Sequence, residues 1–232
     1  MTTYDAAGVS LATAGAVAER LRAAVDSTRT PAVVGSFGAF AGLYALDDDR
    51  LLAASSDGVG TKLVLAREAG RLRDAGRDLA AHCVNDVVTT GAEPLFFLDY
   101  VAAARLDLED VAELVSGAAD VCRDAGCAIL GGETAEMPGV YREEELDFAG
   151  TCVGLVRRDR LVDGARVRDG DVVLGLPSSG LHANGYSLVR RLLADQTLDV
   201  ELDGNLLLAP TRLYLDEVRR LREACDVRAL AH

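Results

Sequence analysis

The sequence predicts an α/β or α+β protein, because strand-like segments alternate with helix-like segments along the chain. Its 232 residues are enough for one large domain or two small ones with a substantial core. Half of the residues are hydrophobic but only 5% are aromatic, so we expect a core built mainly from Ala, Val and Leu.

The first two thirds of the chain contain most of the predicted elements. Apolar residues recur at helical spacing from Leu11 to Val25 after Ser10, a candidate N-cap. Residues 43–46 and 51–54 flank a polar turn and predict a hairpin. Further helices are predicted over residues 61–69, 79–90 and 108–125, and further strands over 94–104, 127–130 and 148–156.

The composition changes over residues 157–168, a charged stretch that contains Gly164. We place a domain boundary there, which gives an N-terminal domain of residues 1–160 and a C-terminal domain of residues 161–232. The second domain is expected to hold a buried strand over 171–176 and helices over 186–194 and 211–224. Because one strand cannot form a sheet, we expect this domain to be incomplete or to depend on another chain.

The chain is strongly acidic, with 37 acidic against 24 basic residues and a net charge of −13. This charge argues against non-specific binding to nucleic acid or to anionic membranes, which both require positive charge. Acidity with a single lysine favours a halophilic protein from a high-salt cytoplasm. Equal stability in dilute buffer and in molar salt would contradict this hypothesis.

Other features predict a cytoplasmic protein. No apolar run approaches the roughly 20 residues of a membrane span, and the N-terminus does not have the pattern of a secretory signal. The five cysteines form no C-x-x-C pair, which is typical of reduced core thiols. A metal cluster or a catalytic thiol is the alternative that we favour less.

The only lysine, Lys62, ends the segment Asp57-Gly58-Val59-Gly60-Thr61-Lys62 between a predicted strand and a predicted helix. Glycines let the backbone approach a ligand, a lysine binds phosphate as a point charge, and an aspartate suits Mg²⁺. The segment therefore suggests a nucleotide-phosphate site. The alternative is a surface lysine after a glycine turn.

Three more polar clusters follow. Asn85 and Asp86 lie within an otherwise apolar helix, where they serve either a binding task or an ordinary core hydrogen bond. Glu133 follows a short strand and Gly131-Gly132, so it is expected at a strand end, where ligands gather, unless it is a solvated turn residue. His182, in the loop of residues 178–186, could act as an acid, a base or a donor, or could simply lie on the surface.

Together these clusters predict phosphoryl transfer with magnesium. Asp57, Asp86 and Glu133 are separated carboxylates, and Mg²⁺ is usually held by a few carboxylates together with substrate phosphates. Phosphoryl transfer needs mainly positioning and charge neutralisation, so it does not require a Ser-His-Asp set. The sequence contains no P-loop motif, which implies another way of binding ATP.

With these motifs in order, the chain resembles the phosphoribosylformylglycinamidine cyclo-ligases, or AIR synthetases, of purine biosynthesis. The likeness covers nearly the whole chain. The matching stretches are residues 4–9 (YDAAGV), 35–40 (GSFGAF), 56–63 (SDGVGTKL), 78–98 (DLAAHCVNDVVTTGAEPLFFL), 131–138 (GGETAEMP), 178–188 (SSGLHANGYSL) and 209–212 (APTR).

The resemblance implies an α+β fold, with a ferredoxin-like first domain and an α/β second domain. It implies a homodimer in which the first-domain sheets form a barrel, with ATP bound near the interface. It also implies ATP-dependent ring closure of formylglycinamidine ribonucleotide, in which the formyl amide oxygen is phosphorylated and then displaced by the amidine nitrogen.

Residue roles follow from the same resemblance. Lys62, Asp86 and His182 are the expected catalytic residues, and Asp57, Asp86 and Glu133 the expected metal ligands. The expected contacts to nucleotide, substrate or phosphates are Gly35, Ser36, Phe37, Gly38, Asp57, Gly58, Gly60, Thr61, Lys62, Asn85, Glu133, Thr134, Ser179 and Asn184.

Two departures from the family are visible. Arg22 stands where the family often carries a lysine, and the family continues beyond Ala231-His232 into a T-G-G-G segment and further strands. Two other functions are therefore considered. One is a related ATP-using enzyme, such as thiamine-monophosphate kinase, selenophosphate synthetase or a hydrogenase maturation factor, and the other is a non-catalytic fragment that binds nucleotide or only dimerises.

Overall fold

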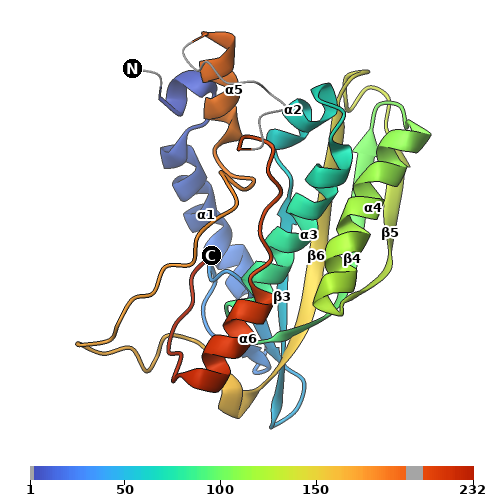
Figure 1. Ribbon diagram of the computed structural model, residues 1–232. Coiled ribbons are helices and arrows are strands. Elements are labelled where there is room, and N and C mark those ends of the chain that lie inside the picture. The colour runs from blue at the N-terminus through green and yellow to red at the C-terminus, as the bar shows by residue number, and fades with distance from the viewer. Residues whose placement is uncertain (1–2, 197–205) are drawn as a thin grey trace.

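A six-stranded mixed sheet in the order β1-β2-β3-β6-β4-β5 forms the centre of this computed structural model, which describes residues 3–196 and 206–232 (Figure 1). Its strands are β1 Val33–Val34, β2 Gly42–Ala45, β3 Arg50–Gly58, β4 Glu93–Ala103, β5 Ala128–Glu136 and β6 Leu146–Arg157. Only the β4–β5 pair is parallel, and the other neighbouring strands are antiparallel. The α+β class is confirmed.

Six α-helices accompany the sheet within the described residues. They are α1 Leu11–Asp26, α2 Lys62–Glu68, α3 Leu72–Val88, α4 Leu108–Ala125, α5 Tyr186–Ala194 and α6 Leu215–Ala224, with 3₁₀ turns η1 Asp5–Ala7 and η2 Arg158–Arg160. The predicted bounds of α4 and α5 are confirmed. The N-cap of α1 is also confirmed, because the Ser10 side chain accepts a hydrogen bond from the Thr13 N–H.

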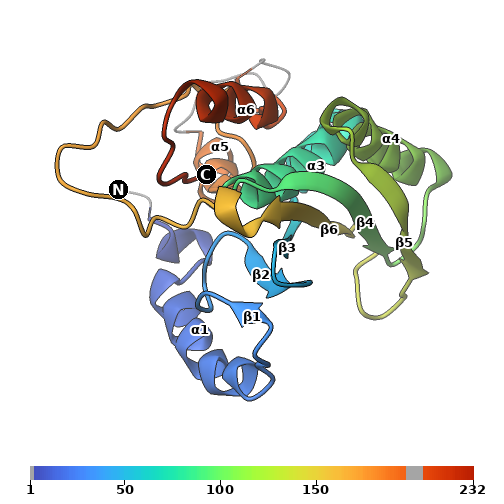
Figure 2. The same cartoon turned by 90° about the horizontal axis from the view of Figure 1, so that it is seen from below.

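Helix α3 is the central element of the protein, and nearly all of it is buried. It packs against β6 and β3 on one side and against α4 on another (Figure 2). Gly76 and Gly117 make the contact with α4 close, because a Cβ at either position would overlap the backbone of Leu114 or Arg73 on the other helix. The predicted start at residue 79 is wrong, since the helix begins at Leu72, where Leu72 and Ala75 are buried in the core and Gly76 packs against α4.

The opposite face of the central strands is not covered by a helix in the described part of the chain (Figure 2). The strand registers place Ala54, Val153 and Phe96 in one row on this face, and Leu98 lies beside Thr151 in the next. Leu98 is 40% exposed, whereas Phe97, which points to the helical face, is fully buried. This face is therefore an exposed, partly apolar sheet surface.

Two other predicted bounds are corrected. Strand β5 runs through Gly131 and Gly132 to Glu136, because Gly132 packs directly on Asp99 of β4. Residues 171–176 form no strand, and Val173 is 94% exposed, because no described strand lies beside them to supply hydrogen-bond partners. The predicted division at residue 160 stays a prediction.

The segment of residues 206–214 runs along α3 and is held there by side chains of that helix. The Thr211 N–H and hydroxyl both donate to Asp78 Oδ1 at 2.8 Å, and the Tyr214 N–H donates to Asn85 Oδ1 at 3.0 Å. These bonds use the backbone of residues 211–214, so α6 begins at Leu215 rather than at the predicted residue 211.

Two further predictions concern the cysteines and membranes. All five cysteines are free thiols, and Cys83, Cys122, Cys127 and Cys152 are buried, as expected for reduced core thiols. Cys225 is exposed, so the expectation of a core position is wrong for this residue. Among residues 3–196 and 206–232, no helix has both the length and the apolar character needed to cross a membrane.

Candidate functional site

A cavity of about 500 Å³ opens where the end of β3 meets α3 and the C-terminal residues. Ser55, Ser56 and Asp57 of β3 and His82 and Asp86 of α3 form one side of it. The other side consists of Ala39–Phe40, residues 180–182, Asn184 and His232. Four of the predicted site residues thus line one cavity, namely Asp57, Asp86, His182 and Asn184.

Asp57 is the first of the two carboxylates in the cavity. One oxygen, Oδ2, lies 2.9 Å from His82 Nε2, and Oδ1 accepts a hydrogen bond from the Gly58 N–H at 2.7 Å. The bond to His82 lowers the pKa of Asp57 from its ordinary value, and the same bond raises the pKa of His82. Asp57 is therefore a stable anion at neutral pH.

Asp86, the second carboxylate, is more deeply buried. Its Oδ2 accepts a hydrogen bond from Ser55 Oγ at 3.0 Å, and its Oδ1 lies 2.9 Å from His232 Nδ1. Because strand β3 holds both Asp57 and Ser55, and α3 holds both His82 and Asp86, two rigid elements fix this group.

His182 faces the cavity from a loop. Its backbone has a φ of 55°, a value that non-glycine residues rarely adopt, and its Nε2 is buried without a hydrogen-bond partner. Burial lowers the pKa of His182, and the nearby His232 lowers it further. The imidazole is therefore neutral at pH 7 and can accept or donate one proton.

Lys62 does not face the cavity, which corrects the expectation that it contacts phosphate. Its side chain is only 1% exposed, and its ammonium lies 2.7 Å from Asp78 Oδ2. The same nitrogen donates to Asp78 Oδ1 and to the carbonyl oxygens of His182 and Ala209, at 2.8–2.9 Å. Since these acceptors use all of its protons, Lys62 instead joins α2, α3 and two C-terminal segments.

Glu133 is far from the two aspartates, so the predicted set of three metal ligands is corrected. It lies within β5 opposite Tyr100, not at the strand end, and its carboxylate accepts a bond from the Thr134 N–H. Strands β6 and β4 separate β5 from β3. Three strand spacings put Glu133 and Thr134 about 14 Å from the line of Asp57.

The other predicted residues lie near the cavity but do not line it. Residues 35–38 directly precede Ala39–Phe40, and Gly58, Gly60 and Thr61 follow Asp57. Asn85 donates to Arg212 O and accepts from Tyr214 N, and its amide nitrogen lies 3.3 Å from His232 Nε2. Ser179 donates to Pro210 O at 2.6 Å. These two residues support the loops around the cavity.

Sequence reasoning missed His82, Ser55 and His232 as site residues. His82 carried a signal, because it lies four residues before Asp86 and shares a helix face with it. Ser55 and His232 carried none, since their places depend on the pairing of β3 with the sheet and on the path of the C-terminal segment.

The donor set of the cavity fits a bound cation. Asp57 and Asp86 offer the oxygen donors that Mg²⁺ takes together with nucleotide phosphates. His82 also lines the cavity, and its buried Nδ1 has no hydrogen-bond partner, so its imidazole is a further candidate ligand. His82, Asp86 and His232 could together hold a metal ion.

The fold is that of an AIR synthase related protein. Residues 38–156 match the family described as AIR synthase related protein, N-terminal domain, and residues 168–232 match its C-terminal domain. The chain therefore belongs to this family, which confirms the resemblance seen in its motifs. One relative is the phosphoribosylformylglycinamidine cyclo-ligase of Myxococcus xanthus (strain DK1622), which is 49% identical over 244 residues that cover 100% of this chain and 71% of the relative.

Solved structures share the fold at lower identity. A structure titled as AaThiL complexed with AMPPCP and TMP is 15% identical, with a TM-score of 0.56 over 89% of this chain and 62% of that one. The thiamine-monophosphate kinase of Stenotrophomonas maltophilia K279a is 20% identical, with a TM-score of 0.54 over 88% of this chain and 63% of that one. The chain thus spans less than two thirds of these two proteins.

Proposed function

We propose that this protein catalyses the ATP-dependent cyclisation of formylglycinamidine ribonucleotide to aminoimidazole ribonucleotide in purine biosynthesis. The observation that carries the proposal is the 49% identity, along the whole chain, to a phosphoribosylformylglycinamidine cyclo-ligase. The cavity supports it independently, because the carboxyl groups of Asp57 and Asp86 and the imidazole of His182 converge there from three segments of the chain.

In this proposal Asp57 and Asp86 hold a divalent cation against the phosphates of ATP. The ion would neutralise phosphate charge, which is the main requirement of phosphoryl transfer. Ser55 and His82 orient the two carboxylates through the hydrogen bonds described above. The Gly35–Gly38 loop, Gly58, Gly60 and Thr61 border the cavity and remain candidates for contact with the nucleotide.

Ring closure needs the amide oxygen of the substrate to leave as phosphate. The γ-phosphoryl group passes from ATP to the formyl amide oxygen, and ADP is released. The amidine nitrogen then attacks the formyl carbon, the C–O bond breaks, and inorganic phosphate departs. His182 is suited to take the proton that the attacking nitrogen loses, because its buried imidazole is neutral.

A homodimer and a high-salt cytoplasmic setting remain part of the proposal. The exposed sheet face that carries Phe96, Leu98 and Val153 supports pairing with a second copy, since such faces are rarely left in water. Sedimentation velocity that finds only a monomer at micromolar concentration would contradict it.

The proposal is tested by incubating the chain with ATP, Mg²⁺ and formylglycinamidine ribonucleotide. We expect aminoimidazole ribonucleotide and ADP to form in equal amounts, measured by chromatography. ADP without aminoimidazole ribonucleotide would favour a related ATP-using enzyme instead. If neither product forms, the chain acts at most as a nucleotide-binding fragment, and the proposal fails.

A further inference from the structure

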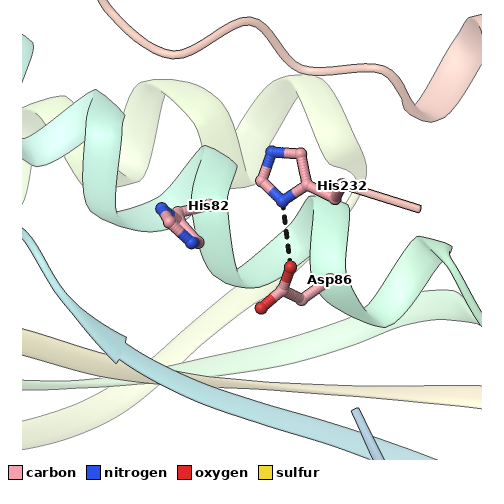
Figure 3. A group of neighbouring side chains, drawn as sticks. All are labelled: His82, Asp86 and His232. Carbon is pink, nitrogen blue, oxygen red and sulfur yellow. Dashed lines mark hydrogen bonds and ion pairs between the residues drawn. The ribbon is translucent and has the colours of Figure 1, made fainter. Parts of the chain in front are cut away.

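Three side chains at the base of the cavity form a compact group of metal-ligand type. His82, Asp86 and His232 each offer one donor atom, and these atoms lie within 4.8 Å of one another (Figure 3). His82 and Asp86 come from successive turns of α3, whereas His232 approaches from the C-terminal segment. The two imidazole rings meet almost edge to face, with centroids 5.1 Å apart.

His82 has one ring nitrogen in contact with a carboxylate and the other without a partner, which is the arrangement of a metal-binding histidine. It is only 8% exposed, its Nε2 lies 2.9 Å from Asp57 Oδ2, and its Nδ1 is buried with no hydrogen-bond partner. A buried polar atom without a partner costs about 1–3 kcal/mol, so an unpartnered nitrogen of this kind needs a reason. When Nε2 carries the proton that Asp57 accepts, Nδ1 presents a lone pair, as in metal-bound histidines that are oriented by a carboxylate.

Asp86 and His232 complete the group. Asp86 Oδ2 is held by the Ser55 hydroxyl, so the other oxygen, Oδ1, is the one directed at His232 Nδ1, 2.9 Å away. One proton lies in the hydrogen bond between these two atoms, and both atoms are of types that can bind a metal ion. A cation that takes the place of that proton would bind both atoms, because metal binding releases protons from its ligands.

The chemistry of this donor set differs from that of a magnesium site. Mg²⁺ prefers oxygen ligands, whereas imidazole nitrogen suits Zn²⁺, Fe²⁺, Co²⁺ and related ions. Two imidazoles and one carboxylate form the facial set that leaves positions open for other ligands. The proposed function treats Asp57 as a direct ligand, but here Asp57 would contact His82 and not the ion.

We propose that His82, Asp86 and His232 bind a divalent transition-metal ion in preference to Mg²⁺, and that Asp57 orients His82 through its contact with His82 Nε2. The inference rests on the proposed function for the use of the cavity, and it replaces the assignment of Asp57 as a direct ligand with a role in orienting His82. It does not require that the chain form product.

Titration of the metal-free chain with Co²⁺, in the absence of nucleotide, tests the proposal. We expect one equivalent to bind, with visible d–d absorption bands typical of nitrogen ligation, and millimolar Mg²⁺ should not displace it. His82→Asn should weaken Co²⁺ binding by at least about tenfold, and Asp57→Asn by about 10–100-fold, the range for an outer-shell partner. His182→Asn is the matched control, because His182 lines the same cavity but is not in the group, and it should change the affinity less than about threefold.

Three results would overturn the proposal. These are the absence of d–d bands, an unchanged Co²⁺ affinity in His82→Asn, or displacement of Co²⁺ by an equal concentration of Mg²⁺. Circular dichroism checks that each variant is folded, and His82→Gln replaces His82→Asn if the latter unfolds. Product formation is not measured here, so a failure of this proposal is distinct from a failure of the cyclo-ligase assay.

Discussion

Lys62→Ala is expected to lower the free energy of unfolding by about 3–5 kcal/mol, the range for breaking a buried ion pair by removing one partner. Burial lowers the pKa of Lys62 and raises that of Asp78, and each partner's charge opposes the other's shift. Removal of the ammonium leaves the Asp78 carboxylate, which is fully buried, with only the Thr211 donors. It also removes the donor that holds the carbonyls of His182 and Ala209.

Urea unfolding followed by circular dichroism measures this loss. The matched control is Arg157→Ala, which breaks an ion pair of similar length with Asp159, because both of those side chains are more than half exposed. An exposed pair contributes about 0–1 kcal/mol, so the control should unfold close to the parent. If Lys62→Ala unfolded at the same urea concentration as the control, the contacts of Lys62 with α3 and the C-terminal segments would not stabilise the fold.

The elements that sequence alone predicted best are those whose faces differ strongly in polarity. Helix α4 was predicted with its correct ends, since Asp107 caps it and Gly126 ends it in a left-handed conformation. Helix α3 was predicted too short because its first turns contain only Leu72 and Ala75 as apolar side chains, and Gly76, which packs on α4, carries no hydrophobic signal. The apolar segment of residues 171–176 was predicted as a strand, but strand formation depends on a neighbour that sequence periodicity cannot supply.

Only part of the site was predicted, because the positions of some of its side chains depend on segments that are distant along the chain. Asp57, Asp86, His182 and Asn184 stand in motifs, and the structure brings them to one cavity. Lys62 has the right chemistry for phosphate, but its direction is decided by Asp78, sixteen residues later, which offers an anion in the core. Glu133 was misplaced because the order of strands across a sheet does not follow their order along the chain.

Asp86→Asn should reduce kcat/KM for aminoimidazole ribonucleotide formation by about 10²–10³-fold, the scale for losing one preorganised electrostatic contact in an active site. The asparagine keeps the shape of the side chain but removes the negative charge that would attract and neutralise the cation. It also replaces one carboxylate oxygen with an NH₂ group, which is a donor only. The asparagine therefore cannot accept hydrogen bonds from Ser55 and His232 on two separate oxygens, as Asp86 does. The cation-dependent uptake of ATP, measured by calorimetry, should fall in parallel.

Asp159→Asn serves as the control for Asp86→Asn, because Asp159 lies in η2, outside the cavity lining, and is exposed. It should leave both kcat/KM and ATP uptake within about twofold of the parent, as is usual for a surface change away from the site. The thermal unfolding of both variants separates lost chemistry from lost structure. A folded Asp86→Asn protein that keeps full turnover and cation-dependent ATP uptake would show that the cavity between β3 and α3 is not where nucleotide and metal meet. The carboxylates would then owe their convergence to the packing of α3 alone.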